Sequence, residues 1–272
     1  MYTIKMLEAE RQKLILKIVQ ERSIVSISDL VEMLEASDAT LRRDVNALAE
    51  RGELRRIRGG AEAIRPRHEA HLVGRPFALS SGIHVPQKRA IARAAATLIQ
   101  DGDSIIISGG TTTFGLTEFL RDRVLDVLTN SIAIVTELLA TSRNRVTIPG
   151  GTVFREQNII LSPFENDTMH NFRAEKMFMG CFGIDRFGLM EADPLIAQSQ
   201  ARLLQRTERI IVMADSSKFQ QRSSMIVTGL EKVSTLITDD SATDEQLALF
   251  REANIDVIKA KVEPEDEQQQ LA

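Results

Sequence analysis

Apolar residues in the first quarter of the chain recur at helical spacing in three short segments. The first segment, residues 7–22, places its leucine, isoleucine and valine side chains on one face, as an amphipathic helix does. Ser26 and Ser37 stand before the second and third segments, and a serine hydroxyl can accept hydrogen bonds from the first N–H groups of a helix. The pattern therefore predicts three helices, the last of which ends before Gly52.

The third predicted helix has two distinct faces. Leu41, Val45 and Leu48 fall at positions i, i+4 and i+7 and predict the buried stripe. The opposite face carries short or forked polar side chains, which suit the base edges and phosphates of a DNA major groove. These candidate DNA-binding residues are Ser37, Ala39, Thr40, Arg42, Arg43 and Asn46.

Two short strands around a Gly-Gly turn are predicted in residues 53–64. Three arginines on this hairpin make it a candidate wing that contacts the DNA backbone. The pattern alone also allows an interaction domain in which these arginines are only a solvated face. The candidate wing residues are Arg55, Arg56 and Arg58.

Beyond the hairpin, strand-like apolar runs alternate with helix-like segments. This alternation predicts an α/β domain with a mainly parallel sheet that is covered on both faces. The predicted strands are residues 104–108, 125–128, 145–148, 176–181, 209–214, 235–238 and 256–258. The predicted helices are residues 87–99, 113–121, 131–141, 193–206 and 243–253.

The length of 272 residues suits two compact domains. Residues 1–64 are predicted to form a winged helix-turn-helix domain, and the turn-rich residues 65–86 a linker. Residues 87–260 are predicted to form the larger domain. Residues 261–272 are acidic and rich in glutamine, and we expect them to be a disordered tail.

Charge and composition narrow the class of protein. The net charge is −4, yet in residues 1–67 the basic residues outnumber the acidic ones by two. Because phosphates are neutralised locally, this distribution is compatible with a DNA-binding first domain. The apolar runs are too short to cross a membrane, and Cys181 is the single cysteine. We therefore expect a cytoplasmic protein without disulfides, with Cys181 as a small buried side chain.

Glycines and polar residues follow the predicted strands, where a parallel sheet keeps its ligand. Glycines let backbone N–H groups approach an anion, a lysine can bind phosphate, and a carboxylate can bind sugar hydroxyls. Each segment alone could be a tight turn, a helix cap or a loop ion pair, but they converge on one edge of the sheet. The candidate effector-binding residues are Gly109, Gly110, Thr111, Thr112, Thr113, Thr129, Asn130, Gly150, Gly151, Asp185, Asp215 and Lys218.

The four histidines, His68, His71, His84 and His170, have no metal-ligand spacing. We expect neither a metal ion nor a cofactor.

The N-terminal motifs resemble a known family. The segment SDATLRRDV at residues 37–45, followed by RGGA at residues 58–61, closely resembles the helix-turn-helix signature of the DeoR family of sugar-metabolism repressors. The resemblance implies binding to double-stranded operator DNA. Arg58 stands where the family often has histidine, and the positive charge is retained.

The larger domain resembles the effector domain of the same family, which is similar in fold to ribose-5-phosphate isomerase. The resemblance implies binding of a phosphorylated sugar and assembly into a homo-oligomer, a dimer or a tetramer. The motifs that carry it are KRAIA at 88–92, DGD at 101–103, GTT at 110–112, TNS at 129–131, GG at 150–151, GID at 183–185 and DSSKF at 215–219.

Two departures from the family bear on the effector. Ser108 stands where the family commonly has an acid, and Gln198 occupies a position often held by glutamate. The loss of two carboxylates near the expected site favours a more acidic effector, such as a phosphorylated sugar acid. Residues 160–163 and 192–198 also resemble the branch of the family that senses ascorbate 6-phosphate.

The combined prediction is a transcriptional regulator, a repressor of a carbohydrate-utilisation operon controlled by a phosphorylated sugar or sugar acid. The alternative is a sugar-phosphate isomerase or hydrolase with an appended DNA-binding head, because fold does not decide function. An isomerase needs a base, and Asp185 and Asp215 are the reasonable candidates.

Overall fold

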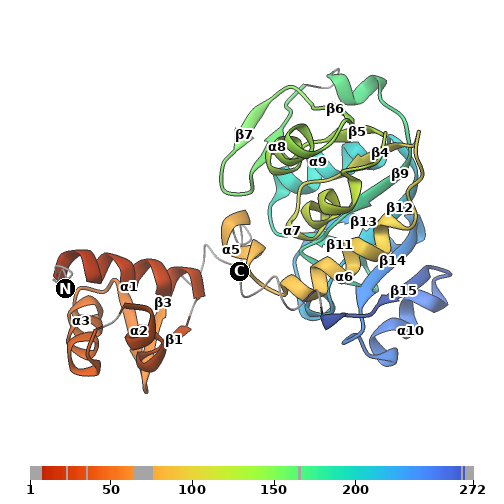
Figure 1. The fold of residues 1–272 in the computed structure, drawn as a ribbon. Coiled ribbons are helices and arrows are strands. Elements are labelled where there is room, and N and C mark those ends of the chain that lie inside the picture. The colour runs from red at the N-terminus through yellow and green to blue at the C-terminus, as the bar shows by residue number, and fades with distance from the viewer. Residues whose placement is uncertain are drawn as a thin grey trace. The chain divides into compact units, whose positions relative to one another are not determined.

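The computed structural model describes residues 8–22, 24–34, 36–63, 76–164, 167–264 and 266. The chain divides into two compact units, Met1–Ala70 and His71–Ala272, which are described separately below (Figure 1). No helix among the described residues is long and apolar enough to cross a lipid bilayer.

The N-terminal unit contains the three predicted helices and the predicted hairpin. A short strand that the sequence did not predict, β1, pairs with β3 and extends the hairpin to three strands in the order β1-β3-β2. Three residues are too few to give a recognisable alternation of apolar and polar positions. The elements are α1 (Glu8–Arg22), β1 (Ile24–Ser26), α2 (Ile27–Leu34), α3 (Asp38–Glu50), β2 (Leu54–Ile57) and β3 (Gly60–Ala63).

Both glycines of the β2–β3 turn are required by the backbone. Gly59 has a φ of 82°, a conformation that glycine adopts without steric cost. A Cβ atom on Gly60 would lie 2.2 Å from the carbonyl oxygen of Val25 in β1. The Gly-Gly turn therefore lets β1 pack directly against the hairpin.

A buried carboxylate joins the first and third helices. Asp44 of α3 is only 2% exposed, and it accepts hydrogen bonds from Arg11 Nε at 2.5 Å and Gln12 Nε2 at 3.2 Å. Both donors lie on α1. Asp44, which is part of the family signature, therefore fixes the position of α3 instead of facing outward with the DNA-binding candidates.

The C-terminal unit is built on a seven-stranded sheet with the order β15-β14-β12-β9-β4-β5-β6. Every neighbouring pair in this sheet is parallel, as the sequence predicted. Its strands are β4 (Ser104–Ile107), β5 (Asp126–Thr129), β6 (Arg145–Thr147), β9 (Ala174–Met179), β12 (Thr207–Met213), β14 (Val233–Asp239) and β15 (Asp256–Ala260). The helices are α5 (Phe77–Ser81), α6 (Val85–Ala96), α7 (Thr111–Phe114), α8 (Ile132–Thr141), α9 (Pro194–Leu204) and α10 (Asp244–Glu252).

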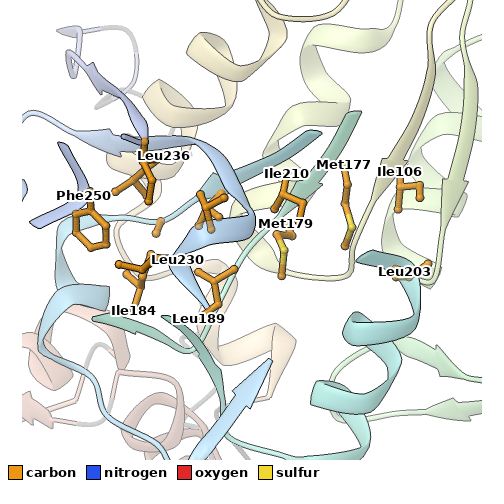
Figure 2. Packing of buried hydrophobic residues seen from close by; sticks show 14 of the residues in the cluster. Ile106, Met177, Met179, Ile184, Leu189, Leu203, Ile210, Leu230, Leu236 and Phe250 are labelled. Atoms are coloured by element: carbon orange, nitrogen blue, oxygen red, sulfur yellow. The ribbon is translucent and has the colours of Figure 1, made fainter. Parts of the chain in front are cut away.

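The large sheet is buried on both faces because alternate residues of its strands enter two different cores. Ile105 and Ile107 of β4 pack in the cluster that includes residues of α6 and α8. Ile106, between them, packs in the cluster that includes Leu203 of α9 and Phe250 of α10, and Figure 2 shows this second core. Continuous apolar strands of this kind are the signature of a covered parallel sheet.

Several short elements were not predicted. A hairpin formed by β7 (Thr152–Phe154) and β8 (Ile159–Leu161) follows β6, and β10 (Gly183–Asp185), β11 (Gly188–Glu191) and β13 (Met225–Thr228) form a small antiparallel sheet. These strands have three or four residues, too few for a clear period. The segment predicted as one helix at residues 113–121 is α7 followed by the 3-10 helix η1 (Gly115–Leu120).

The expected boundaries of the linker and tail differ from the described structure in two places. Helix α5 lies within residues 65–86, and α6 begins at Val85. Asp266, in the expected tail, is fully buried and accepts hydrogen bonds from Arg89 and Arg93 of α6, both at 2.7 Å. These partners are more than 170 residues away in the sequence, so composition alone could not reveal these two ion pairs.

The Asp44 contacts give a first testable prediction. Asp44→Ala leaves Arg11 without its buried carboxylate and should destabilise the N-terminal unit by about 3 kcal/mol. Amide hydrogen exchange of the full chain should then be faster throughout α1–α3 and unchanged in the C-terminal unit. Asp38→Ala, which removes an exposed carboxylate from the same helix, is the matched control and should change the protection of α1–α3 much less than Asp44→Ala does. Equal protection in the Asp44 variant and the native protein would contradict this account.

Candidate functional site

The candidate recognition helix α3 presents the predicted residues on its exposed side. Ser37 begins the helix, because its Oγ accepts a hydrogen bond from the Thr40 N–H at 3.3 Å and lies 2.8 Å from Thr40 Oγ1. Ala39, Arg42 and Arg43 are exposed, Asn46 is half-buried, and the apolar stripe faces the core. Ser37 and Thr40 thus shape the start of the helix, whose outer face presents the other four predicted residues.

The arginines of this unit differ in how their charge is balanced. Arg42 donates to Asp38 on the same helix at 2.5 Å, and Arg55 donates to Glu62 across the hairpin at 2.8 Å. Arg43, Arg56 and Arg58 are exposed and make no ion pair with an acid in the described part of the chain. These three side chains are therefore the most available for DNA phosphates.

In the second unit, the loop after β4 is held by an asparagine that follows β5. Asn130 is 2% exposed, and its Oδ1 accepts a hydrogen bond from the Gly109 N–H at 2.8 Å. Its Nδ2 lies 3.5 Å from Ser199 Oγ on α9. Asn130 therefore joins the ends of two neighbouring strands to the helix that covers them.

The loop after β12 is held by two buried carboxylates. Asp215 is 2% exposed and begins the 3-10 helix η3 (Ser216–Gln220), accepting from the backbone N–H and the hydroxyl of Ser217. Asp239, at the end of β14, accepts from the Ser216 N–H at 2.6 Å and its hydroxyl at 3.1 Å. Both acids fix η3, which carries the half-buried Lys218.

An acid that the sequence did not single out adjoins these loops. Glu191, the last residue of β11, accepts a hydrogen bond from Gln200 Nε2 at 2.9 Å. Burial raises the pKa of Glu191 to about 7, while the bond from Gln200 and the charge of Lys218 lower it. Glu191 can therefore gain or lose a proton close to neutral pH.

Cys181 lies close to the same charges. Burial raises the pKa of its thiol to about 12, with Lys218 lowering the pKa and Glu191 and Asp215 raising it further. The thiol is therefore protonated at neutral pH and is a poor nucleophile. Among the described residues, no three His, Cys, Asp or Glu side chains are grouped to hold a metal ion.

We refer to these groups as the strand-end cluster: Gly109, Asn130, Cys181, Glu191, Ser199, Gln200, Asp215 and Lys218. It combines one ammonium group, two carboxyls and two amides. Gln200 Oε1 is buried and has no hydrogen-bond partner among the described residues, and the same is true of Ser108 Oγ beside Gly109. Buried polar atoms without a partner are rare in folded proteins.

The remaining predicted effector residues have local contacts. The Thr113 hydroxyl donates to Ser108 O at 2.7 Å, and Thr129 Oγ1 accepts from the Ser131 N–H at 3.1 Å. Asp185 Oδ1 accepts from the Phe187 N–H within the β10–β11 turn. Thr112 is buried, Gly110 and Thr111 are half-buried, Gly150 is exposed, and Gly151 lies against the backbone of Leu161.

One expectation about the effector site was wrong. Gln198 does not face the strand-end cluster; it is exposed and lines a separate cavity on the outer side of α9. A helix turns by about 100° per residue, so Ser199 and Gln200 point inward where Gln198 cannot. The sequence analysis missed Glu191 instead. The signal that could have revealed it is a single carboxylate directly after the apolar residues Leu189 and Met190.

A winged helix-turn-helix unit with exposed arginines, joined to an α/β unit with a polar strand-end cluster, is the architecture of a DNA-binding regulator with a sensor domain. The sequence matches the DeoR-like helix-turn-helix domain over residues 11–67. It also matches the DeoR C terminal sensor domain over residues 83–240. The chain belongs to the DeoR family of transcriptional regulators.

Curated relatives match most of the chain. The HTH-type transcriptional regulator UlaR of Shigella dysenteriae serotype 1 is 30% identical over 257 residues, which cover 93% of this chain and 100% of the relative. UlaR of Shigella sonnei is 31% identical with the same coverage, and UlaR of Escherichia coli O139:H28 is 30% identical.

Solved structures are similar only at a low level. Ribose 5-phosphate isomerase a from Methanocaldococcus jannaschii has a TM-score of 0.36 and 14% identity over 48% of this chain and 53% of that chain. The eIF2B beta subunit from Chaetomium thermophilum has a TM-score of 0.40 and 14% identity over 66% of this chain and 55% of that chain. This chain thus spans about half the length of each. TM-scores and identities this low say nothing about activity.

The unequal pairing of the arginines predicts unequal effects on DNA binding. Arg43→Ala and Arg56→Ala should each weaken operator binding by about tenfold. Each should also reduce the slope of log affinity against log salt concentration by about one. Arg55→Ala should have a smaller effect, because Glu62 already balances its charge. Fluorescence anisotropy with the DNA upstream of the protein's own coding sequence, at several salt concentrations, measures both quantities.

The control for general charge loss is Arg121→Ala in the sensor unit, which should bind DNA like the native protein. An Arg55 variant that lost as much affinity as the Arg43 and Arg56 variants would show that the ion pairing is irrelevant to binding.

The raised pKa of Glu191 predicts a pH-dependent stability. Between about pH 4.5 and 7 the folded protein keeps a proton on Glu191 that the unfolded chain has lost, so stability falls as the pH rises through this range. Glu191→Gln removes this dependence, and its stability relative to the native protein should increase by about 1–3 kcal/mol from pH 5 to pH 8. Urea unfolding followed by circular dichroism measures the difference, with the exposed Glu252→Gln as control. Parallel stability curves for the Glu191 variant and the native protein would refute the prediction.

Proposed function

We propose that this regulator is a repressor of a carbohydrate-utilisation operon, controlled by a phosphorylated sugar or sugar acid that binds at the strand-end cluster. The observation that carries the proposal is Lys218, whose charge acts on Glu191 and Cys181 and whose loop is fixed by the buried carboxylates Asp215 and Asp239. An ammonium group supplies the charge that a phosphate requires. Carboxyl and amide groups beside it suit the hydroxyls of a sugar.

Unpartnered buried oxygens support a polar ligand at this place. Ser108 Oγ and Gln200 Oε1 make no hydrogen bond within the described residues. Leaving a buried polar atom unsatisfied costs about 1–3 kcal/mol. Ligand hydroxyls could satisfy both atoms, and the gain would add to the affinity.

An acidic effector remains the narrower form of the proposal. Ser108 stands where the family commonly has an acid, but Glu191 restores one carboxyl near Lys218. Because the pKa of Glu191 is about 7, this carboxyl can take up a proton and so donate a hydrogen bond to an anionic ligand instead of repelling it. The resemblance of residues 160–163 and 192–198 to the ascorbate 6-phosphate branch makes that compound the first effector to test.

Regulation requires that effector and operator binding be coupled. Helix-turn-helix proteins commonly bind two half-sites as dimers. We therefore propose a homo-oligomer, a dimer or a tetramer, held together by residues 87–260. The effector would favour one arrangement of the subunits, and operator DNA must then change the effector affinity by the same factor.

Lys218→Met should separate the two activities of the protein. Loss of the ammonium group should weaken effector binding by about tenfold or more, since hydrogen bonds to charged groups contribute about 1.5–3 kcal/mol. Operator affinity without effector should stay within about twofold, because electrostatic interactions with DNA are local. Isothermal titration with ascorbate 6-phosphate and with the phosphates of neutral sugars measures the effector affinity. Fluorescence anisotropy measures the operator affinity.

The matched control is Lys232→Met, which removes an exposed lysine of the same unit. Undiminished effector binding by the Lys218 variant would remove the strand-end cluster as the effector site. Tighter binding of the phosphates of neutral sugars than of ascorbate 6-phosphate would reject the acidic effector and leave the proposed site standing.

A further inference from the structure

A cavity of about 480 Å³ lies on the sensor unit, apart from the strand-end cluster. One wall is the outer side of α9 with the residues that follow it, and the other is formed by Ser162, Pro163 and the 3-10 helix η2 (Thr168–Asn171). No residue of the strand-end cluster lines it. The volume is in the range of cavities that bind small metabolites, about 300–1,000 Å³.

Two arginines of this cavity differ in how their charges are balanced. Arg202 donates to the Ser162 carbonyl oxygen at 2.8 Å, and its Nη2 lies 3.7 Å from the carboxylate of Asp167. Arg206 Nη2 lies 3.2 Å from His170 Nδ1 and pairs with no acid in the described ranges. Asp167 thus lies beside Arg202, and the positive charge of Arg206 has no counter-charge among the described residues.

The chemistry of Arg206 indicates the class of ligand. A half-buried guanidinium keeps several N–H donors in one plane, an arrangement that matches the two oxygens of a carboxylate or a phosphate. The imidazole of His170 is in contact with it, and the amides of Gln198 and Gln205 line the same cavity. Amide groups around a cation that has no acid partner among the described residues favour an oxyanion over a cation or an apolar ligand.

We propose that this cavity is a second ligand site, which binds the phosphate or carboxylate group of a small metabolite through Arg206. The site is separate from the effector site proposed above and does not depend on it.

Inorganic phosphate and malonate are suitable probes, measured by their effect on the thermal midpoint of the full chain at constant ionic strength. A ligand that binds the folded state raises the midpoint in a saturable way. The measurement uses the Lys218→Met background, so that the strand-end cluster contributes little. The midpoint should rise with at least one probe, and Arg206→Gln should raise the apparent dissociation constant by about tenfold or more.

Arg209→Gln removes an exposed arginine near the start of β12, outside the cavity, and should leave the response unchanged. Arg206→Lys keeps the charge and should retain part of the response, which separates lost binding from lost folding. A saturable response that is the same in the Arg206→Gln and Arg209→Gln variants would overturn the proposal. So would the absence of a response to both probes.

Discussion

The seven parallel strands of the sensor unit impose the arrangement on which its proposed chemistry depends. Strands that run in one direction bring their carboxyl ends to one edge, and here that edge carries Gly109, Asn130 and Asp215. The sheet can be parallel because helices cover both faces, which requires strands that are apolar on both sides. The polar strand ends are therefore the exception in an apolar sheet, and their charges act in a poorly solvated place.

Helix α9 connects the two candidate ligand sites of this unit. Its inward residues Ser199 and Gln200 reach the strand-end cluster, while Gln198 and Arg202 line the cavity on the other side. In the N-terminal unit, α3 combines two roles in the same way. Its inner face holds Asp44 against α1, and its outer face presents the exposed Arg43, a candidate DNA contact. In both units, the buried face of a helix fixes the position of the groups that its opposite face presents.

The sequence was sufficient to predict the two-domain organisation, the seven strands of the parallel sheet and the three helices of the N-terminal unit. It succeeded because most of these strands are continuous apolar runs, such as residues 105–107, and because helices have clear caps such as Ser37. The strand-end cluster was predicted in part, because Asn130 and Asp215 closely follow strands and Lys218 lies in the 3-10 helix after β12. Glu191 and the inward turn of Gln200 were missed, since both depend on which way a short strand and a helix face. The Asp266 ion pairs depend on tertiary packing alone.

In the proposed function, one chain couples an effector at the strand-end cluster to operator DNA at the winged helix. The most direct test is to measure effector affinity by titration calorimetry twice, for the free protein and for the protein saturated with operator. Coupling predicts that the ratio of these two affinities equals the ratio of operator affinities with and without the effector. An effector that binds tightly with the same affinity in both states, and leaves operator binding unchanged, would contradict the account.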